Sequence, residues 1–577
     1  MPTQAIFSGR LESAYRRELQ RLLARNALGR LWAKDASLWP AEGREAESIH
    51  SNLLWLDLPE RLGPLVERVA VRSAEIEPAG FEDVVFVALG SSSIAAEAVL
   101  KVPAARLGKR TFLLNTIDPD AVRALEASLL LEKTLFVFPS KFGKDIDAHS
   151  LFLYFMEQLR LRGSPSPAGH FIALAEENSY LGELAGEYQF IERFFDPPGI
   201  LGRYSALIHF NFLVAALCRL DRGDLLARTG AMRDACKSGA PVEANPALLL
   251  AALLAAAQFE QFDRLAFFTS QNLQAVARRI GELVGVSTSK NGHGIIPLFG
   301  CPPPPAGLLW NNCLSVCITV RGKKDPHLAE YCERLHSAEA PLVVVDLSGP
   351  EEFAAEGFKW EMATALACSA LEVNPFRDPD RRESRARTTQ ILEQISSGGQ
   401  WPSPAPRVRG AEIELYAEGE TRRELSTLSL LEALRSFLAL RRPEGYLALL
   451  PFMDLNPARV SLLERIRNQF ESMLGVPVLV TSGPQYLHTV SQVYSDGPAM
   501  GLFIIVTANP RKNLAVPGAD YTFKQIQAAL AQTDFESLGG KGKPVIRLHF
   551  TGGADAGLVE LQTILGHLPA KRDPPVH

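Results

Sequence analysis

The stretch DVVFVALGSSSIAAEAVLKV, from Asp83 to Val102, decides the fold of this chain. It opens on a short run of apolar and β-branched residues, which predicts a buried strand. Gly90 and three serines follow, and the segment from Ile94 onward has the composition of a helix. A strand that passes through a glycine turn into a helix is the first half of a β–α–β unit, so the stretch predicts a parallel sheet.

The alternation of strand and helix recurs along most of the chain. Helical segments of roughly 10–15 residues separate the apolar runs, which implies parallel sheets with helices on both faces. Further strands are predicted at RTFLLNT (110–116), TLFVFPSK (134–141), HFIALA (170–175), RLAFFTS (264–270), LSVCITV (314–320), APLVVVDLS (340–348), GYLALLPFM, VPVLVTSG, MGLFIIVTA and PVIRLHF.

The pattern predicts an α/β protein of several domains. We expect a helical N-terminal segment over residues 1–78, because the periodicity there is helical with few strand patterns. Two doubly wound parallel-sheet domains follow over 79–225 and 226–392. A linker or long loop rich in Gly, Pro and Ser covers 393–424, and a further α/β portion covers 425–577.

Composition restricts the class of partner. The chain of 577 residues is 47% hydrophobic and 22% charged, as in an ordinary globular protein, and its net charge is −5. This charge argues against nucleic acid or an anionic membrane as the main partner. The longest apolar run, from Ala247 to Phe259, is too short to span a bilayer, and the N-terminus lacks a signal-peptide core. We expect a cytoplasmic protein that binds a small molecule or another protein, without a cofactor.

The seven cysteines are scattered and odd in number, which is typical of a reduced, intracellular chain. Cys313 and Cys317 lie four residues apart in a β-rich run, so both fall on one face of a strand. No His or second Cys pair lies near them in sequence, and we expect buried small hydrophobic residues and no metal site.

Open parallel sheets bind ligands at the carboxyl ends of their strands, and three polar turns are expected there. In the first, Ser91, Ser92 and Ser93 start a helix. Free N–H groups, the helix dipole and the hydroxyls would together hold a phosphate. The alternative is a simple helix N-cap, which needs one serine.

The second turn is FPSKFGKDIDA. Ser140, Lys141 and Lys144 could bind an anion there, and Asp145 or Asp147 could cap the next helix. The alternative is a solvated cap with surface lysines. The third turn, PPGILGRYSALI, holds Arg203, a catalytic candidate whose guanidinium could face an anion or a developing enolate. The alternative is a surface residue, since a lone arginine at a helix start is usually exposed.

A fourth polar segment, ELVGVSTSKNGHGIIP from Glu282 to Pro297, reads as a helix end that becomes a glycine-punctuated loop. Ser287, Thr288 and Lys290 suit anion binding. At the first turn of the loop, where an acid or base would serve catalysis, the chain has Val286.

Together these segments resemble a known family. GSSSIAAEA, SKFGKD, GRYSAL, STSKNGHGIIP and NPFRDP occur in the order of the glucose-6-phosphate isomerases, and YLHTVSQVYSDGP is similar to the branch fused to transaldolase. The resemblance covers nearly the whole chain from LWAKDASLWP onward. It implies two sugar-isomerase-type (SIS) α/β domains, a glucose 6-phosphate or fructose 6-phosphate ligand, a homo-oligomer, and a possible metabolic-enzyme partner.

The residues that differ from the family pattern are those that carry out the reaction in the family. The family's glutamate base corresponds to Val286, which cannot accept a proton. The family's lysine after NPF corresponds to Arg385, and its His-Lys pair to Tyr494 and Ser495. Residues 142–145 replace two threonines of the phosphate loop. The resemblance therefore implies a protein that resembles an isomerase but lacks its base, histidine and lysine.

The other residues of the four polar segments keep the character of an anion-binding site. The resemblance adds His488, as a further catalytic candidate, and Arg385 to this set. Two residues could replace the lost base. Glu282 lies one helical turn before Val286, and His293 stands where the family has a lysine. The alternatives are a solvated helix residue and an ordinary loop residue.

Three hypotheses follow. The first is a homologue with impaired isomerase chemistry that keeps a sugar-phosphate pocket for binding, regulation or assembly. The second is an active aldose–ketose isomerase with a rewired site that uses Glu282 or His293. The third is a purely structural subunit in which Asp145 repels phosphate. The Lys144–Asp145 pair distinguishes the first hypothesis from the third.

Overall fold

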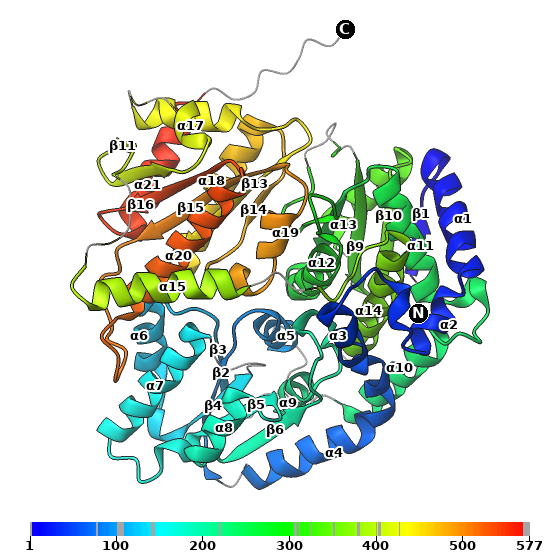
Figure 1. Ribbon diagram of the computed structural model, residues 1–577, viewed down its shortest axis with the longest axis horizontal. Helices are drawn as coiled ribbons and strands as arrows, with labels where there is room; N and C mark the ends of the chain where they lie inside the picture. Colours follow the sequence, from blue (N-terminus) through cyan, green and yellow to red (C-terminus); the bar gives the residue numbers. More distant parts are fainter. Residues whose placement is uncertain are drawn as a thin grey trace. The chain divides into compact units, whose positions relative to one another are not determined.

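The computed structural model (Figure 1) divides into two compact units, which are described separately. Unit 1 comprises residues 1–114, 130–145 and 162–378, and unit 2 comprises 115–129, 146–161 and 379–577. The residues that the structure describes are 3–76, 79–100, 109–139, 145–217, 221–304, 309–310, 312–323, 325–349, 352–377, 381–399, 401, 405–425, 427 and 429–568.

The first sheet of unit 1 contains the stretch that opens with Asp83. Its strands run in the order β3-β2-β4-β5-β6, and all neighbours are parallel. They are β2 (Asp83–Val87), β3 (Arg110–Leu114), β4 (Thr134–Pro139), β5 (Phe171–Glu176) and β6 (Glu192–Asp196). β2 is buried along its whole length, as expected of a central strand covered on both faces. The predicted parallel α/β sheet is confirmed.

The second sheet of unit 1 has the order β1-β10-β9-β7-β8. Its strands are β1 (Thr3–Ile6), β7 (Arg264–Thr269), β8 (Ile296–Leu298), β9 (Cys313–Val320) and β10 (Leu342–Leu347). Four strands are parallel, and β1 adds an antiparallel edge. The prediction of a purely helical N-terminal segment missed β1, because four residues are too few to show a period.

Helices cover the sheets of unit 1 and form the frame of the site. α12 (Gln274–Thr288) packs against α5 (Ser91–Leu100) and α14 (Phe353–Ala370), and α14 packs against α11 (Pro246–Phe259). α11 is buried on nearly all sides, as its apolar sequence predicts. No helix in the described ranges is both long and apolar enough to cross a membrane.

The remaining helices of unit 1 have the following bounds: α1 (Gly9–Ala24), α2 (Ala27–Trp32), α3 (Arg44–Asn52), α4 (Leu58–Ile76), α8 (Tyr180–Glu187), α9 (His209–Leu217), α10 (Arg222–Ala235) and α13 (Pro326–Ser337). The helical N-terminal segment expected over 1–78 therefore contains four α-helices, α1 to α4, in the part that the structure describes.

Unit 2 is built on a third sheet with the order β11-β12-β16-β15-β13-β14. β13 to β16 are parallel, and β11 and β12 add an antiparallel edge. The strands are β11 (Val408–Arg409), β12 (Ile413–Ala417), β13 (Tyr446–Phe452), β14 (Val478–Val480), β15 (Gly501–Ala508) and β16 (Val545–Phe550).

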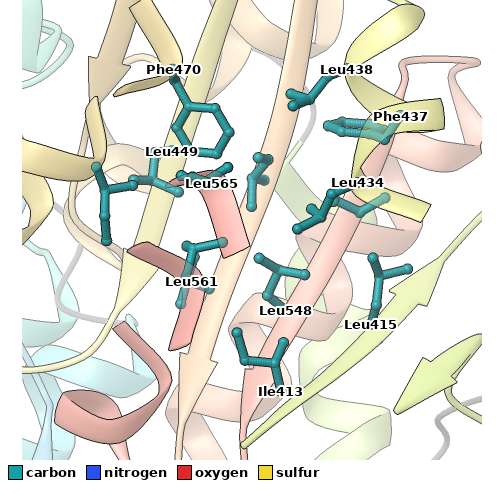
Figure 2. Close-up of a cluster of buried hydrophobic side chains, with 14 of the residues drawn as sticks. Ile413, Leu415, Leu434, Phe437, Leu438, Leu449, Phe470, Leu548, Leu561 and Leu565 are labelled. Carbon is teal, nitrogen blue, oxygen red and sulfur yellow. The ribbon is translucent and has the colours of Figure 1, made fainter. Parts of the chain in front are cut away.

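The helices of unit 2 come from distant parts of the sequence. They are α6 (Pro119–Ser128), α7 (Ile146–Leu161), α15 (Arg381–Ser396), α16 (Thr421–Glu424), α17 (Leu430–Ala439), α18 (Pro457–Leu474), α19 (Ser491–Asp496), α20 (Phe523–Gly540) and α21 (Ala554–Gly566). Figure 2 shows the core of this unit, where Leu449 and Leu548 of the sheet lie among Leu434, Phe470 and Leu561 of the surrounding helices. The predicted fold class, two parallel-sheet domains with a further α/β portion, is confirmed.

Candidate functional site

The serine turn of the first sheet lies at the N-terminus of α5. Gly90 has φ +69°, a conformation that glycine adopts at little cost, and the helix begins at Ser91. The Ser93 hydroxyl is buried and donates back to the Gly90 carbonyl at 2.7 Å. Ser91 and Ser92 are partly exposed, and the Ser91 hydroxyl donates to the Glu282 carboxylate. One serine therefore closes the turn, and another links it to α12.

Glu282 is a buried, paired carboxylate. Only 3% of its surface is exposed. One oxygen accepts from Ser91, and the other lies 3.3 Å from a guanidinium nitrogen of Arg279 one turn earlier. Arg279 also donates to the Ser205 hydroxyl at 3.0 Å. The reading of Glu282 as a solvated helix residue is therefore wrong, because the packing of α12 on α5 encloses the side chain.

The GRYS segment lies against the serine turn. A Cβ on Gly202 would stand 3.1 Å from the Ser91 hydroxyl oxygen, so the two turns are in close contact. Arg203 lies in the 3-10 turn Gly202–Tyr204, is 6% exposed, and donates to the Pro375 carbonyl at 2.8 Å. The reading of Arg203 as a surface arginine is wrong, since its guanidinium is buried and joins the GRYS turn to the NPF segment.

Val286, Ser287 and Thr288 form the last turn of α12, although the sequence predicts a loop from Val286 onward. Val286 is 5% exposed, and its carbonyl accepts from the Lys290 ammonium at 2.6 Å. The Ser287 hydroxyl lies 3.3 Å from the Tyr204 hydroxyl. These buried contacts extend the helix and override the weak local preference of Val, Ser and Thr for it.

The two other polar groups of this segment also have partners inside the protein. The Thr288 hydroxyl donates to the Val284 carbonyl at 2.8 Å and accepts from the Ile295 N–H at 3.0 Å. Ser287, Thr288 and Lys290 are all at least 95% buried. Their hydrogen bonds therefore hold the end of α12 in place.

The glycine-punctuated part of the segment is a tight turn. Lys290 and His293 exchange both backbone hydrogen bonds at 3.0 Å, and Asn291 and Gly292 between them have φ values of 53° and 83°. An Asn-Gly pair with two positive φ angles is the usual two-residue hairpin turn. His293 is exposed at its end.

Glu361, which belongs to none of the sequence motifs, lies beside this cluster. Its carboxylate accepts from the Ala206 N–H at 2.8 Å. Burial raises the pKa of Glu361 to about 8, and the Arg279 charge only partly opposes this. The available indication was a glutamate within KWEMATALACS, an otherwise largely apolar helical run in which a carboxylate is unexpected.

A small cavity adjoins the cluster between α5, α9, α12 and α14. Its volume is about 90 Å³. Ligand pockets usually measure roughly 300–1,000 Å³, so a sugar phosphate does not fit within this cavity alone. Its lining is mostly apolar and includes Ala95, Ala98, Asn211, Phe212, Val276, Arg279, Ile280 and Gly357.

His488 and Arg385 belong to unit 2. The His488 ring nitrogen lies 2.7 Å from a carboxylate oxygen of Asp147, near the start of α7. Burial opposes ionisation of Asp147, but the His488 charge and hydrogen bonds outweigh it, so the pKa of Asp147 is lowered. Arg385 is exposed on α15, and Tyr494 is buried in α19, with its hydroxyl 3.3 Å from that of Thr481.

The structure thus brings four of the sequence motifs together in unit 1, namely the serine turn, GRYS, the end of α12 and NPF. The predicted anion-binding residues Ser140, Lys141 and Lys144 lie outside the described residues. No group of three His, Cys, Asp or Glu side chains that could hold a metal ion occurs within the parts of the chain that the structure describes.

Known proteins match this chain in part. A glucose-6-phosphate isomerase of Treponema pallidum (strain Nichols) is 30% identical over 154 residues, which cover 24% of this chain and 28% of that protein. The isomerase of Carboxydothermus hydrogenoformans is 30% identical over 149 residues, 26% of this chain and 32% of that protein. The matched segments thus span less than a third of these relatives. No family model matches the chain.

The fold is also found among solved structures. A hypothetical protein of Thermus thermophilus superposes with a TM-score of 0.57 at 20% sequence identity, covering 68% of this chain and all of that protein. The chain is therefore similar in sequence to glucose-6-phosphate isomerases over about a quarter of its length, and it shares its fold with the Thermus thermophilus protein.

Proposed function

We propose that this protein binds a sugar phosphate of the glucose 6-phosphate or fructose 6-phosphate class and has lost efficient isomerase chemistry. One observation carries the proposal. Glu282, the nearest carboxylate on α12 to Val286, is buried and paired through both oxygens. The resemblance implies that Val286 takes the position of the family's base. The proposal is thus that the serine turn still binds phosphate while the proton acceptor is missing.

Isomerisation needs a base that reaches a C–H proton of the open-chain sugar. The geometry of Glu282 is poor for this role. Ser91 covers one oxygen, Arg279 lies beside the other, and 3% exposure leaves no path for a substrate carbon. A productive approach would require the Ser91 and Arg279 contacts to break first.

The binding role rests on the serine turn and the groups around it. The N-terminus of α5 offers backbone N–H groups and the partly exposed Ser92 to a phosphate. Ser140, Lys141 and Lys144, with Arg203, complete the proposed anion site through the family resemblance. Regulation or assembly of a metabolic enzyme, in a cytoplasmic homo-oligomer of the transaldolase-fused branch, is the proposed setting.

A second candidate is an active isomerase that uses Glu282 as a relocated base. The contact between Ser91 and Glu282 favours it, because it places a carboxylate at the turn where the phosphate is proposed to bind. His293 is a weaker candidate, since it lies exposed on a hairpin turn. A purely structural subunit is the third reading.

A coupled assay that starts from fructose 6-phosphate, together with calorimetric titration of the same ligand, tests the proposal. We expect micromolar binding and turnover at least about 10²-fold below that of an ordinary isomerase. The variants are Glu282→Gln and Val286→Glu, with the exposed Glu330→Gln of α13 as the matched control.

Each result has a distinct meaning. Ordinary turnover that disappears in Glu282→Gln, but not in Glu330→Gln, would overturn the proposal in favour of the relocated base. Absence of both binding and turnover would support the structural subunit. Gain of activity in Val286→Glu would show that the valine occupies the position of the base. Light scattering of the same sample measures the oligomeric state.

A further inference from the structure

Cys317 and Cys332 form a close thiol pair in unit 1. Cys317 lies on β9, and Cys332 lies 15 residues later on α13, which packs against the neighbouring strand β10. Their sulfur atoms are 2.9 Å apart. A covalent S–S bond is about 2.05 Å long, so a small approach of the two sulfurs would join them.

The surroundings hold the pair in this arrangement. Cys317 sits in the interior of the sheet, aligned with Phe268 of β7 and Val344 of β10, and is fully buried. Tyr331, next to Cys332, packs its ring on Phe268 at 4.5 Å between centroids. The helix is therefore anchored on the sheet beside the cysteine, and the contact between the sulfurs does not depend on a mobile loop.

The two thiols differ in their exposure to solvent. Cys332 is partly exposed, whereas Cys317 is enclosed. The hydrogen bond between the two thiols lowers the pKa of Cys332, while the same bond and burial raise the pKa of Cys317. A thiolate is the nucleophile in thiol oxidation, so Cys332 is the group that meets a soluble oxidant first.

We propose that Cys317 and Cys332 are a modification site at which hydrogen peroxide forms an intramolecular disulfide. The Cys332 thiolate attacks one peroxide oxygen, the O–O bond breaks, and the departing hydroxide takes a proton to become water. The sulfur of Cys317, as it loses its proton, then attacks the sulfur of the resulting sulfenic acid. The S–O bond breaks, and a second water leaves. Two thiols lose two electrons and two protons, which the peroxide gains.

The disulfide would restrain a cavity at the edge of the sheet. The segment between the two cysteines contributes Thr319, Lys323 and Asp325 to a cavity of about 250 Å³, to which Ser270 and Asn272 also contribute after β7. This cavity lies at the carboxyl ends of β7 and β9, where open parallel sheets bind ligands. Oxidation would fix the strand and the helix that form two of its walls.

The experiment treats the folded full-length protein with hydrogen peroxide, alkylates the remaining thiols, and maps the peptides by mass spectrometry. We expect a linked peptide pair containing Cys317 and Cys332, a mass loss of two hydrogen atoms, and reversal by dithiothreitol. Thermal unfolding should occur at a higher temperature in the oxidised form than in the reduced form, since the cross-link restricts the unfolded chain.

Cys332→Ser should abolish both the linked peptide and the thermal shift. Cys313→Ser, a buried cysteine of the same strand, is the matched control and should keep both. The proposal fails if Cys317 and Cys332 are both alkylated after oxidation. It also fails if Cys332 ends as a sulfinic acid or pairs with a different cysteine.

Discussion

The hydroxyl of Ser91 donates a hydrogen bond to the carboxylate of Glu282, which lies 191 positions later in the sequence. The contact joins the N-terminus of α5, where a phosphate is proposed to bind, to the helix that carries Val286. It also commits the carboxylate nearest to Val286 on α12 to a structural partner. The contact therefore stabilises this cluster and, under the proposed function, also keeps Glu282 from acting as the base.

Removing the Ser91 hydroxyl tests this contact. Ser91→Ala leaves a buried carboxylate oxygen short of one donor, and we expect a loss of about 1–3 kcal/mol in the free energy of unfolding. Urea denaturation measures it. Ser92→Ala, at the partly exposed neighbouring position, is the control and should cost less. A double-mutant cycle with Glu282→Gln should show coupling, and additive losses would contradict the pairing.

Glu361 gives the stability of unit 1 a pH dependence. Burial raises its pKa from 4.5 to about 8, so between these pH values the native state holds a proton that the unfolded state has released. The contribution of Glu361 to stability is therefore largest below pH 4.5 and decreases as the pH rises toward 8. We expect Glu361→Gln to flatten this slope by up to about 1 kcal/mol per pH unit.

Asp534 of unit 2 provides the matched control for Glu361. Burial raises the pKa of Asp534 from 3.8 to about 6, and its carboxylate accepts from Tyr486 at 2.5 Å. Asp534→Asn should flatten the stability profile only below about pH 6. Unfolding midpoints measured from pH 4 to pH 8 separate the two windows. Identical profiles for the two variants would contradict the assignment.

The His488–Asp147 pair is the third test. Because the pKa of Asp147 is lowered, its contribution to stability is present above its ordinary pKa of 3.8 and is lost as the pH falls through the folded value. His488→Gln removes the opposing charge, and burial should then raise the pKa of Asp147. We expect a loss of about 3 kcal/mol at pH 7 and a smaller loss near pH 3, measured by urea denaturation. An equal loss at both pH values would show that the charge of His488 has no effect.

Substitutions of two glycines test whether the hairpin after α12 is a structural turn or a loop that binds ligand. Gly292 has φ +83° with open space around it, so Gly292→Ala should cost only about 1 kcal/mol and leave sugar-phosphate binding unchanged. In Gly294→Ala, the new Cβ would lie 2.6 Å from the Ser289 Cα, so a backbone shift and a loss of more than about 2 kcal/mol are expected. Thermal unfolding and calorimetry measure both effects. Loss of binding in Gly292→Ala would show that the turn contacts the ligand.

Local patterns predicted the parallel sheets because each buried strand is a continuous apolar run followed by a turn. The same patterns failed at the end of α12. Val286, Ser287 and Thr288 have weak helix propensity, so a loop was expected there. Burial against Tyr204 and the bond from Lys290 to the Val286 carbonyl keep these residues helical. Tyr204 belongs to a distant segment, so its contact cannot be predicted from the local sequence.

Local sequence patterns also failed to predict the partners of the cysteines and of the buried carboxylates. The sequence directed attention to Cys313 and Cys317, which are neighbours on one strand, but the close pair is Cys317 with Cys332 of the next helix. Glu361 occurs in an apolar helix without any local motif, and its partner is the backbone of Ala206. The packing of helices on sheets decides such pairs, and packing depends on the whole core.

The sequence by itself determined the alternation of strands and helices and the resemblance to a known family through motif order, from which the proposed place of Val286 at the position of the base follows. These properties depend on residue type and short-range spacing. Only the tertiary structure decided that Glu282 is buried and paired with Ser91 and Arg279. The physical reason is that a carboxylate's role depends on its burial and its partners, which come from segments far apart in the chain.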